Sequence, residues 1–249
     1  MDADLYARFY EIEDWYWWSV GSRAIFREWM AAALRGRRGR LLDVGCGTGA
    51  MTHELAPLGA VVGLDLAPEA IAWSRRRGLA ALCVGSAEEL PFRSAGFDAV
   101  AAVDIVEHTE DARMLREIAR VLRPGGAALL HVPAFPILWG EHDEVNHHRR
   151  RYRRAALAAV VEASGLVVER VSYANTLLFP AAAAVRLAKR AARAVRRPRP
   201  PAAEIYDLPA WVNRGLVGIL ALERTLLRRV NFPFGVSLLC LARKPDVVS

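Results

Sequence analysis

From residue 40 onward, short apolar runs alternate with segments in which apolar residues recur every three or four positions. Continuous apolar runs are typical of buried strands, and the longer spacing is typical of amphipathic helices. Regular alternation of the two favours an α/β fold in which crossover helices connect the strands of a largely parallel sheet. The predicted strands are 40–44, 60–65, 80–84, 97–103, 126–132, 166–174 and 236–242, and the predicted helices are 50–57, 68–77, 110–122 and 152–164.

Two further segments lie outside this alternation. Residues 5–35 are rich in aromatic side chains and fit two helices joined near Gly21. Neighbours on a helix point about 100° apart, so Trp15 to Trp18 cannot all face one core, and at least one is expected to line a pocket or a partner surface. Residues 176–234 separate the last two strands, and insertions of this length are usually lids or binding elements.

The insertion begins apolar, becomes basic and proline-rich at 196–201, where we expect a mobile bend, and ends in a helix at 209–229. We therefore expect four parts along the chain. They are a helical cap (1–35), a cofactor-binding core (36–175), a helical lid (176–234) and the final strand with its tail (235–249).

The stretch from Leu41 to Gly49 predicts a strand, a tight turn and the start of a helix. Glycines at alternate positions permit positive φ and let a ligand approach the backbone, and a helix start presents unpaired N–H groups. These residues alone do not identify the ligand. The spacing Gly45-x-Gly47-x-x-Ala50 also satisfies the dinucleotide fingerprint of NAD-binding proteins.

Two acidic residues bear on the choice of ligand. Asp65 ends the second predicted strand, twenty residues after Gly45, where a carboxylate binds the ribose hydroxyls of a nucleoside cofactor of either kind. Asp43 lies inside the strand that leads to the glycines, where it would repel the pyrophosphate of NAD and attract a cationic sulfonium group. The pair favours a sulfonium nucleoside.

Composition narrows the class of protein. The 249 residues are 53% hydrophobic with a mean hydropathy of +0.13, which suits a folded chain with one substantial core. No apolar run is long enough to cross a bilayer and the first residues lack a basic signal-peptide start, so we expect a cytoplasmic protein. Three cysteines in apolar surroundings give no disulfide framework.

The net charge of +7 lies largely in two clusters, at 149–154 and 186–199. A localised patch without interleaved aromatic residues or a known motif argues against a nucleic-acid partner. The basic part of the insertion instead predicts peripheral contact with an anionic membrane surface.

Five motifs in order now identify a resemblance: Leu42 to Gly49, Gly63-Leu64-Asp65, Ala87 to Phe92, Phe97-Asp98 and Leu122 to Gly126. Together they resemble class I S-adenosylmethionine-dependent methyltransferases of the small-molecule type (types 11 and 12), across roughly residues 36 to 175. The resemblance implies a Rossmann-like seven-stranded sheet with an antiparallel last strand and helices on both faces. It also implies S-adenosylmethionine as the cofactor.

By the same resemblance, the cofactor-binding set is Asp43, Gly45, Cys46, Gly47, Gly49, Asp65, Leu66, Ser86, Ala87, Glu88, Asp104 and Arg23. The glycine loop and Asp43 would hold the methionine end, Asp65 the ribose, and the segment at Ser86 the adenine. The family commonly has an aspartate where Ser86 stands, so a charge-assisted hydrogen bond is lost there. Arg23 would pair with the cofactor carboxylate, with a surface arginine on a helix as the alternative.

Polar segments follow the fourth and fifth strands, at the sheet edge where α/β proteins bind ligands. If the acceptor is a hydroxyl, a base is useful, and His108, His142 and His148 are the candidates. The predicted substrate-binding residues are Trp18, Trp139, Asp143, Arg150 and Tyr152. The same loop has three interpretations: a metal site, a solvated loop and a substrate pocket. We rank metal binding by His142, Asp143, His147 and His148 below the other two, so we expect no metal. Three arginines before a helix oppose its dipole, and a bound anion or an acidic neighbour would explain them.

The sequence thus predicts a methyltransferase that transfers a methyl group by in-line displacement to a small-molecule acceptor. The acceptor would be a natural product or a lipid-linked molecule, hydrophobic or anionic, and its methylated atom (O, N or C) stays open. The alternatives are a non-catalytic cofactor-binding or membrane-associated scaffold and, ranked lower, an NAD-binding oxidoreductase.

Overall fold

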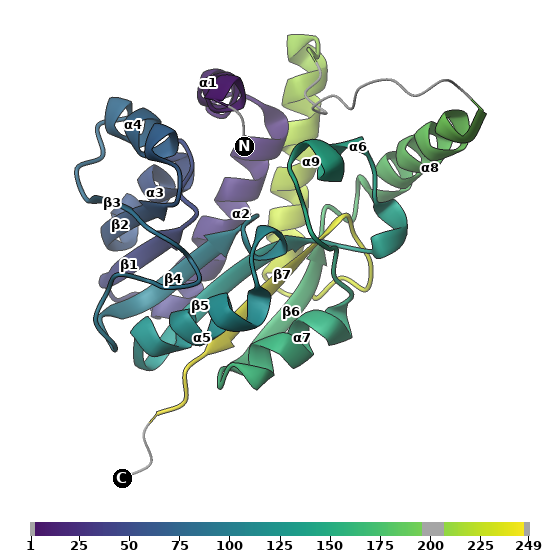
Figure 1. Ribbon diagram of the computed structural model, residues 1–249. Helices are drawn as coiled ribbons and strands as arrows, with labels where there is room; N and C mark the ends of the chain where they lie inside the picture. Colours follow the sequence, from purple (N-terminus) through teal and green to yellow (C-terminus); the bar gives the residue numbers. More distant parts are fainter. Residues whose placement is uncertain (1–2, 196–206, 247–249) are drawn as a thin grey trace.

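In a computed structural model, which describes residues 3–195 and 207–246, seven strands form one sheet in the order β3-β2-β1-β4-β5-β7-β6 (Figure 1). The strands are β1 (Gly39–Val44), β2 (Gly59–Asp65), β3 (Leu82–Val84), β4 (Phe97–Val103), β5 (Leu122–Pro133), β6 (Val167–Ala174) and β7 (Ser237–Arg243). Strand β7 pairs antiparallel with both β5 and β6, whereas β1 to β5 pair in parallel. The expected Rossmann-like sheet with an antiparallel last strand is confirmed.

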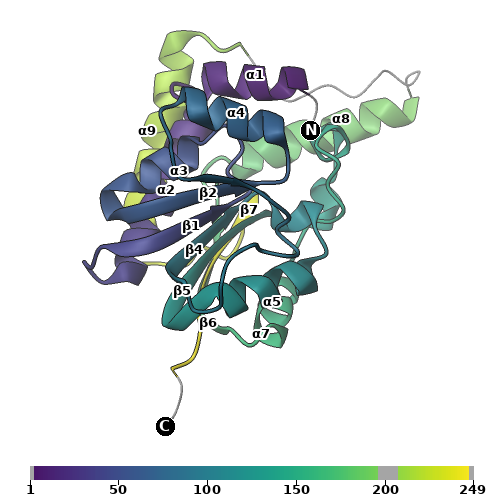
Figure 2. The same cartoon turned by 60° about the vertical axis from the view of Figure 1, so that its left-hand side comes forward.

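Helices cover both faces of the sheet (Figure 2). On one side lie α2 (Trp17–Leu34), α3 (Ala50–Leu55), α4 (Pro68–Arg76) and α9 (Ala210–Leu227), and on the other lie α5 (Asp111–Val121) and α7 (Arg154–Ala163). Side chains of a strand alternate between faces, so β1 sends Leu41 toward Trp29 of α2 and Leu42 toward the opposite cluster around Leu115. Strands buried on both faces explain the continuous apolar runs of the sequence.

The predicted join between two helices near Gly21 is wrong. The break falls instead between α1 (Ala3–Ile12) and α2, and Gly21 lies buried inside α2. A Cβ atom at Gly21 would stand 2.3 Å from Cδ1 of Leu220 in α9. The glycine therefore permits two helices to approach closely, and it does not mark a turn.

Three other boundaries differ from the expectation. Strand β5 begins at Leu122, four residues before the predicted start, because Leu122 already pairs with Phe97 of β4, ahead of a register shift after which Ala127 pairs with Ala99. The expected polar loop 136–148 contains a short 3-10 helix, η3 (Pro136–Leu138), and a helix α6 (Glu141–Val145). Helix α7 begins at Arg154 because Tyr152 instead pairs with Ala134 in a β-bridge.

The insertion between β6 and β7 contains α8 (Phe179–Val195) and α9, and the predicted bend at 196–201 lies outside the described residues. Helix α9 packs along α2 and buries Leu220 and Leu227, while Arg228 pairs with Glu28 of α2. Helix α8 projects from the sheet beside η3 (Figure 1). Within the described residues, no helix is both long and apolar enough to span a membrane.

Candidate active site

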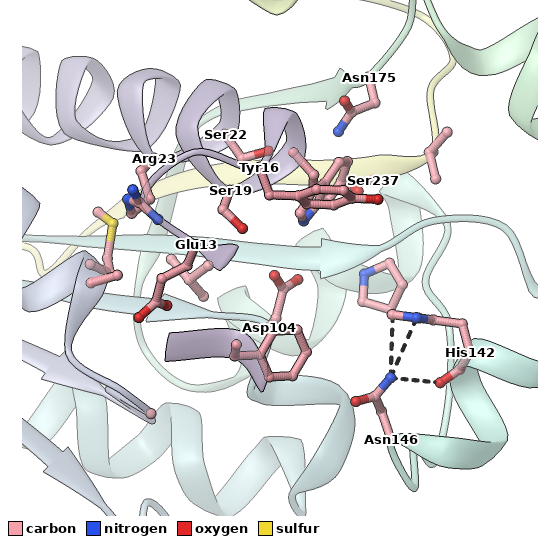
Figure 3. A pocket seen from close by; sticks show the side chains of 18 of the residues that line it. Glu13, Tyr16, Ser19, Ser22, Arg23, Asp104, His142, Asn146, Asn175 and Ser237 are labelled. Carbon is pink, nitrogen blue, oxygen red and sulfur yellow. Dashed lines mark hydrogen bonds between the residues drawn. The ribbon is translucent and has the colours of Figure 1, made fainter. Parts of the chain in front are cut away.

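A cavity of about 770 Å³ opens above the carboxyl ends of β1 and β4, between α1, α2, α6 and α8 (Figure 3). Its floor is the glycine loop and the segment after β4, and its walls are largely apolar side chains of the helices. This is the edge of a parallel sheet at which α/β proteins bind their ligands. The cavity is large enough for a nucleoside cofactor together with part of a second molecule.

The glycine loop forms the cofactor end of this cavity. Gly45, Gly47 and Gly49 all have positive φ, between 55° and 85°. Gly45 faces Ile105, which a Cβ atom would meet at 2.9 Å, whereas nothing lies within 4 Å of a Cβ at Gly47. Open space at Gly47 is what close approach of a ligand to the backbone requires, so the loop fits a bound nucleoside.

Asp43 and Asp65 lie on either side of the loop. The Asp43 side chain is buried, accepts a hydrogen bond from Thr52 Oγ1 at 2.6 Å, and lines the cavity. Burial, with the charge of Asp65 adding to it, raises the pKa of Asp43 to about 6. Asp65 accepts hydrogen bonds at 2.9 Å from the N–H groups of Gly47 and Ala67, and so fixes the loop from the end of β2.

The expected adenine segment lies at the far edge of β2 and β3, outside the residues that line the cavity. Ser86 Oγ accepts a hydrogen bond from the Glu88 N–H at 3.1 Å, and Ala87 is buried. The Glu88 carboxylate accepts the Glu110 N–H at 2.8 Å, at the start of α5, while Leu66 is 70% exposed. Gly49 packs against Leu79 and Ser74 beneath the loop. These residues shape the turn around the cofactor site.

Arg23 of α2 lines the cavity with a side chain that is 14% exposed, so the alternative of a surface arginine is wrong. It lies within 4.0 Å of Glu54 and 3.8 Å of Asp14. Nearby, Glu13 at the end of α1 accepts a hydrogen bond from Thr48 Oγ1 and pairs with Arg77. The N-terminal helix is thus tied to the glycine loop by a buried carboxylate.

The structure brings the three predicted bases together at the other end of the cavity. His108, His142 and His148 all line it, and the ring of His148 lies 4.7 Å from that of His108 and 5.7 Å from that of His142, centroid to centroid. Burial, assisted by His148, lowers the pKa of His108 to about 4. The side-chain amide nitrogen of Asn146 lies 3.4 Å from Nδ1 of His142 (Figure 3). The histidines therefore differ in environment although they share one site.

His148 is held by a buried carboxylate. Its Nδ1 lies 2.8 Å from Asp143 Oδ1, and Arg151 donates to both oxygens of the same carboxylate, at 2.8 and 2.9 Å. These hydrogen bonds lower the pKa of Asp143 below its usual range although burial acts in the opposite direction. Nδ1 is thus the ring nitrogen of His148 that meets the carboxylate, and Nε2 is the nitrogen left on the side of Glu107.

Trp18 is the predicted substrate-binding residue that lines the cavity. The other four have partners elsewhere: Asp143 holds His148, Arg150 and Tyr152 both donate to Asp111 Oδ2, at 2.6 and 2.8 Å, and Trp139 caps η3. The expected acidic neighbours of the arginine run are therefore present, as Asp111 and Asp143. They offset two of the three positive charges that precede α7, those of Arg150 and Arg151.

Sequence reasoning missed Glu107, a buried carboxylate that lines the cavity. Neither oxygen has a hydrogen-bond partner within the described residues, and Oε1 lies 4.0 Å from Nε2 of His148. Burial, with Asp104 adding to it, raises the pKa of Glu107 well above its usual range. Its place directly before His108, after an apolar strand, was the signal available in the sequence.

The structure also assembles metal-ligating groups that differ from the set considered in the sequence. Ligand atoms of Glu107, His108 and His148 lie within 4.8 Å of one another, the one such group among the described residues. Both carboxylate oxygens of Asp143 already accept hydrogen bonds from Arg151, and His147 is exposed. Neither residue therefore belongs to this group of potential ligands. A cation is therefore an alternative that any test of the site chemistry must include.

Comparison with known proteins agrees with this geometry. A family of methyltransferase domains matches residues 42–130. A ubiquinone biosynthesis O-methyltransferase of Xanthomonas axonopodis pv. citri is 34% identical over 166 residues, which cover 58% of this chain and 70% of the relative. Its counterpart in Xanthomonas oryzae pv. oryzae is 39% identical over 111 residues, but these cover 41% of this chain and 46% of that protein.

Among solved structures, a methyltransferase in complex with the Haloferax volcanii Trm112 activator superposes with a TM-score of 0.64 at 21% identity, over 99% of this chain and 96% of that one. At this level of identity, the likeness concerns the fold alone. The glycine loop between two acidic residues, the seven-stranded sheet and the sequence relatives together show that the chain belongs to the class I S-adenosylmethionine-dependent methyltransferases of the small-molecule type.

Proposed function

We propose that the acceptor atom is a hydroxyl oxygen and that His148 is the general base that takes its proton. The observation that carries this proposal is the arrangement around Nε2 of His148, which faces the cavity beside Glu107 while Asp143 holds Nδ1. A carboxylate behind an imidazole fixes its tautomer and supports the positive charge that the ring gains with a proton. Asp143 is then a positioning residue.

An acceptor hydroxyl at ordinary hydrogen-bond distance, about 2.8 Å, from Nε2 of His148 would donate to that nitrogen. Oε1 of Glu107 lies 4.0 Å from Nε2, and both Glu107 oxygens are buried, so this carboxyl borders the proposed base without contacting the acceptor. His108 is the weaker candidate because an imidazole with a pKa of about 4 accepts a proton poorly at neutral pH.

Bound S-adenosylmethionine supplies an electrophilic methyl group on a positive sulfur. As the acceptor oxygen forms its bond to the methyl carbon, the carbon–sulfur bond breaks and sulfur takes the electron pair. The hydroxyl proton passes to Nε2 of His148, and solvent later removes it. The protein's main contribution would be to align the acceptor oxygen with the methyl group. Asp43, the glycine loop and Arg23 would hold the cofactor in place for this.

The shape of the cavity supports an acceptor with an apolar portion. Beyond the histidines, it continues between α2 and α8, where the lining residues are Trp18, Leu178, Ala181, Ala182, Val185 and Leu216. Residues 176–234 then act as the cover of the acceptor, and residues 1–35 as the cap over the cofactor. O-methylation is also what the names of the ubiquinone biosynthesis relatives state for those proteins.

A peripheral membrane contact is the second part of the proposal. Val185 and Leu187 of α8 are 50% and 46% exposed, and Trp211 of α9 is 72% exposed. In Figure 1 the described end of α8 and the first turns of α9 lie on the same side of the sheet as α1, and all three helices contribute residues to the cavity lining. With the net charge of +7, this face suits an anionic lipid surface that delivers an apolar acceptor.

The test of the acceptor chemistry compares His148→Gln with His147→Gln, its exposed neighbour outside the cavity lining. Phenols, catechols and amines carrying apolar tails are assayed with S-adenosylmethionine. We expect methylation of hydroxyls, a fall in kcat of about 10²- to 10³-fold in H148Q and near-normal activity in H147Q. Raising the pH toward 10 should partly restore H148Q, because a phenolate needs no base.

Two outcomes would overturn the proposal. One is methylation of amines with no hydroxyl acceptor modified by the wild-type protein. The other is loss of wild-type activity in a chelator, with recovery on addition of Mg²⁺ or Zn²⁺, which would assign Glu107, His108 and His148 to a cation.

A further inference from the structure

Asp104 and His131 form a hydrogen-bonded pair, with a buried histidine, that the acceptor chemistry does not use. Asp104 follows the last residue of β4, and His131 lies beside it in β5. Oδ1 of Asp104 is 2.7 Å from Nδ1 of His131, and the Asp104 backbone N–H donates to the His131 carbonyl at 3.1 Å. One residue thus fixes both the main chain and the side chain of Asp104.

The surroundings of His131 define which ring nitrogen donates. The side chain is 1% exposed, its ring centroid is 4.6 Å from that of Phe26 and 6.2 Å from that of Trp18, and Nε2 has no hydrogen-bond partner among the described residues. A proton on Nε2 would be a buried donor without an acceptor, which is costly. A ring that donates from Nδ1 to the Asp104 carboxylate fits both observations.

The backbone of Asp104 is left-handed, with a φ of 51°. Non-glycine residues rarely adopt this conformation, at a cost of about 1–2 kcal/mol, and it persists where surrounding contacts impose it. Here it turns the carboxylate into the cavity, between Glu13 on the cofactor side and His142 on the acceptor side (Figure 3). The Asp104 side chain is 45% exposed to that space.

The position of Asp104 relates it to the reacting atoms. Ile105, the next residue, packs on Gly45, so Asp104 lies directly beside the loop that holds the methionine end of the cofactor. His142 and His148 line the cavity on its other side. Burial raises the pKa of Asp104, but His131 first, and then His148 and His142, lower it below its ordinary value. The sulfonium group must lie at this boundary, because its methyl has to face the acceptor. A carboxylate there attracts the positive sulfur.

We propose that His131 is a positioning residue that holds the Asp104 carboxylate toward the sulfonium of S-adenosylmethionine. The demethylated product, S-adenosylhomocysteine, has a neutral sulfur, so the pair gives the site a preference for substrate cofactor over product cofactor. This role depends on the cofactor and is independent of whether the acceptor is a hydroxyl or which residue is its base.

The experiment measures the Kd of S-adenosylmethionine and of S-adenosylhomocysteine by calorimetry for wild type, His131→Leu and His131→Asn. Leucine fills the apolar site between Phe26 and Trp18 but removes the donor, whereas the asparagine amide can replace Nδ1–H. We expect H131L to bind S-adenosylmethionine about tenfold more weakly and the product less than twofold more weakly. H131N should recover most of the affinity for S-adenosylmethionine that H131L loses. In turnover assays of H131L, the KM for the cofactor should change more than kcat.

Asp104→Asn gives a second measurement that does not depend on how H131L folds. It retains an oxygen that accepts the Nδ1–H hydrogen bond but removes the charge, so it should show the same selective loss. Equal weakening of both cofactors in D104N and H131L would overturn the proposal, as would an unchanged Kd for S-adenosylmethionine. Thermal melting confirms that each variant is folded before its affinities are compared.

Discussion

At the scale of single residues, burial decides which side chains of the cavity carry charge. Asp43, Glu107 and His108 are each shifted toward the neutral form by loss of water, while Asp143 is kept ionised by His148 and Arg151. The cofactor end therefore has a carboxylate that ionises near pH 6, and the acceptor end has a charged carboxylate one hydrogen bond behind the base.

Asp43 makes a pH-dependent contribution to stability that can be measured. Its folded pKa of about 6 exceeds the ordinary value of about 3.9 for an unfolded chain, so the folded protein holds a proton that the unfolded chain releases. This stabilisation is complete below about pH 4 and is lost as the pH rises through 6. Asp43→Asn keeps an oxygen for Thr52 but cannot ionise.

We therefore expect D43N, without cofactor, to gain on the order of 2 kcal/mol over wild type between pH 4 and pH 8, and to bind S-adenosylmethionine more weakly. Thermal denaturation at both pH values measures the first effect and calorimetry the second. Asp207→Asn, at a position 88% exposed, is the control for removal of a carboxylate at the surface. If the stability of D43N relative to wild type does not increase with pH, the proposed ionisation of Asp43 is contradicted.

Local sequence patterns select residues of the glycine loop more readily than residues at the histidine end of the cavity, because the two depend on different kinds of information. Asp43, Gly45 and Gly47 belong to one local turn, whose chemistry is complete within a few positions. Glu107 and His131 could not be selected in this way. A glutamate is by default a surface residue, and a histidine within an apolar strand becomes informative when its neighbour across the sheet is known.

At the scale of elements, the close contact between α2 and α9 joins the insertion to the sheet. Gly21 of α2 receives Leu220 of α9, and Leu227 enters the same core cluster as Trp29. In a sequence, a glycine that admits a neighbouring helix looks the same as one that ends a helix. The strand order was predictable from local patterns and the family resemblance, whereas this helix pairing depends on residues about 200 positions apart.

Gly21→Ala tests this contact. A Cβ atom would stand 2.3 and 2.7 Å from the Leu220 side chain, so α9 must move, and overpacking of this kind costs about 1–3 kcal/mol. Gly218→Ala in α9 is the matched control, since no atom lies within 4 Å of its Cβ position and better helix propensity should stabilise it by about 0.5–1 kcal/mol. Urea denaturation measures both. Equal effects of the two substitutions would contradict close packing at Gly21.

At the scale of the whole molecule, the projecting α8, the start of α9 and α1 lie on one side (Figure 1), and all three contribute to the cavity lining. Helices α5 and α7 cover the other face of the sheet (Figure 2). The proposed recognition of an apolar acceptor would then share one side with the exposed apolar side chains of α8 and α9. The net positive charge adds a long-range attraction for anionic surfaces.

Sedimentation with vesicles tests the membrane contact. We expect the protein to sediment with vesicles of one-third phosphatidylglycerol in phosphatidylcholine, and less with phosphatidylcholine alone or at 0.5 M salt, because screening weakens surface attraction. Trp211→Ala should reduce binding several-fold, whereas Trp139→Ala, at a half-buried position near η3, should leave it near wild type. Equal sedimentation with both lipid compositions would contradict an electrostatic contact.

The pairing of Ala174 with Ser237 at the ends of β6 and β7 means that the insertion leaves the sheet and returns to it at neighbouring positions. The entropy of closing that loop grows slowly with its length, and its two ends are held by a ladder of strand hydrogen bonds. The fold can therefore accept insertions of different length and composition here with little change at the glycine loop. If residues 176–234 cover the acceptor as proposed, grafting residues 175–236 between related chains should change acceptor preference.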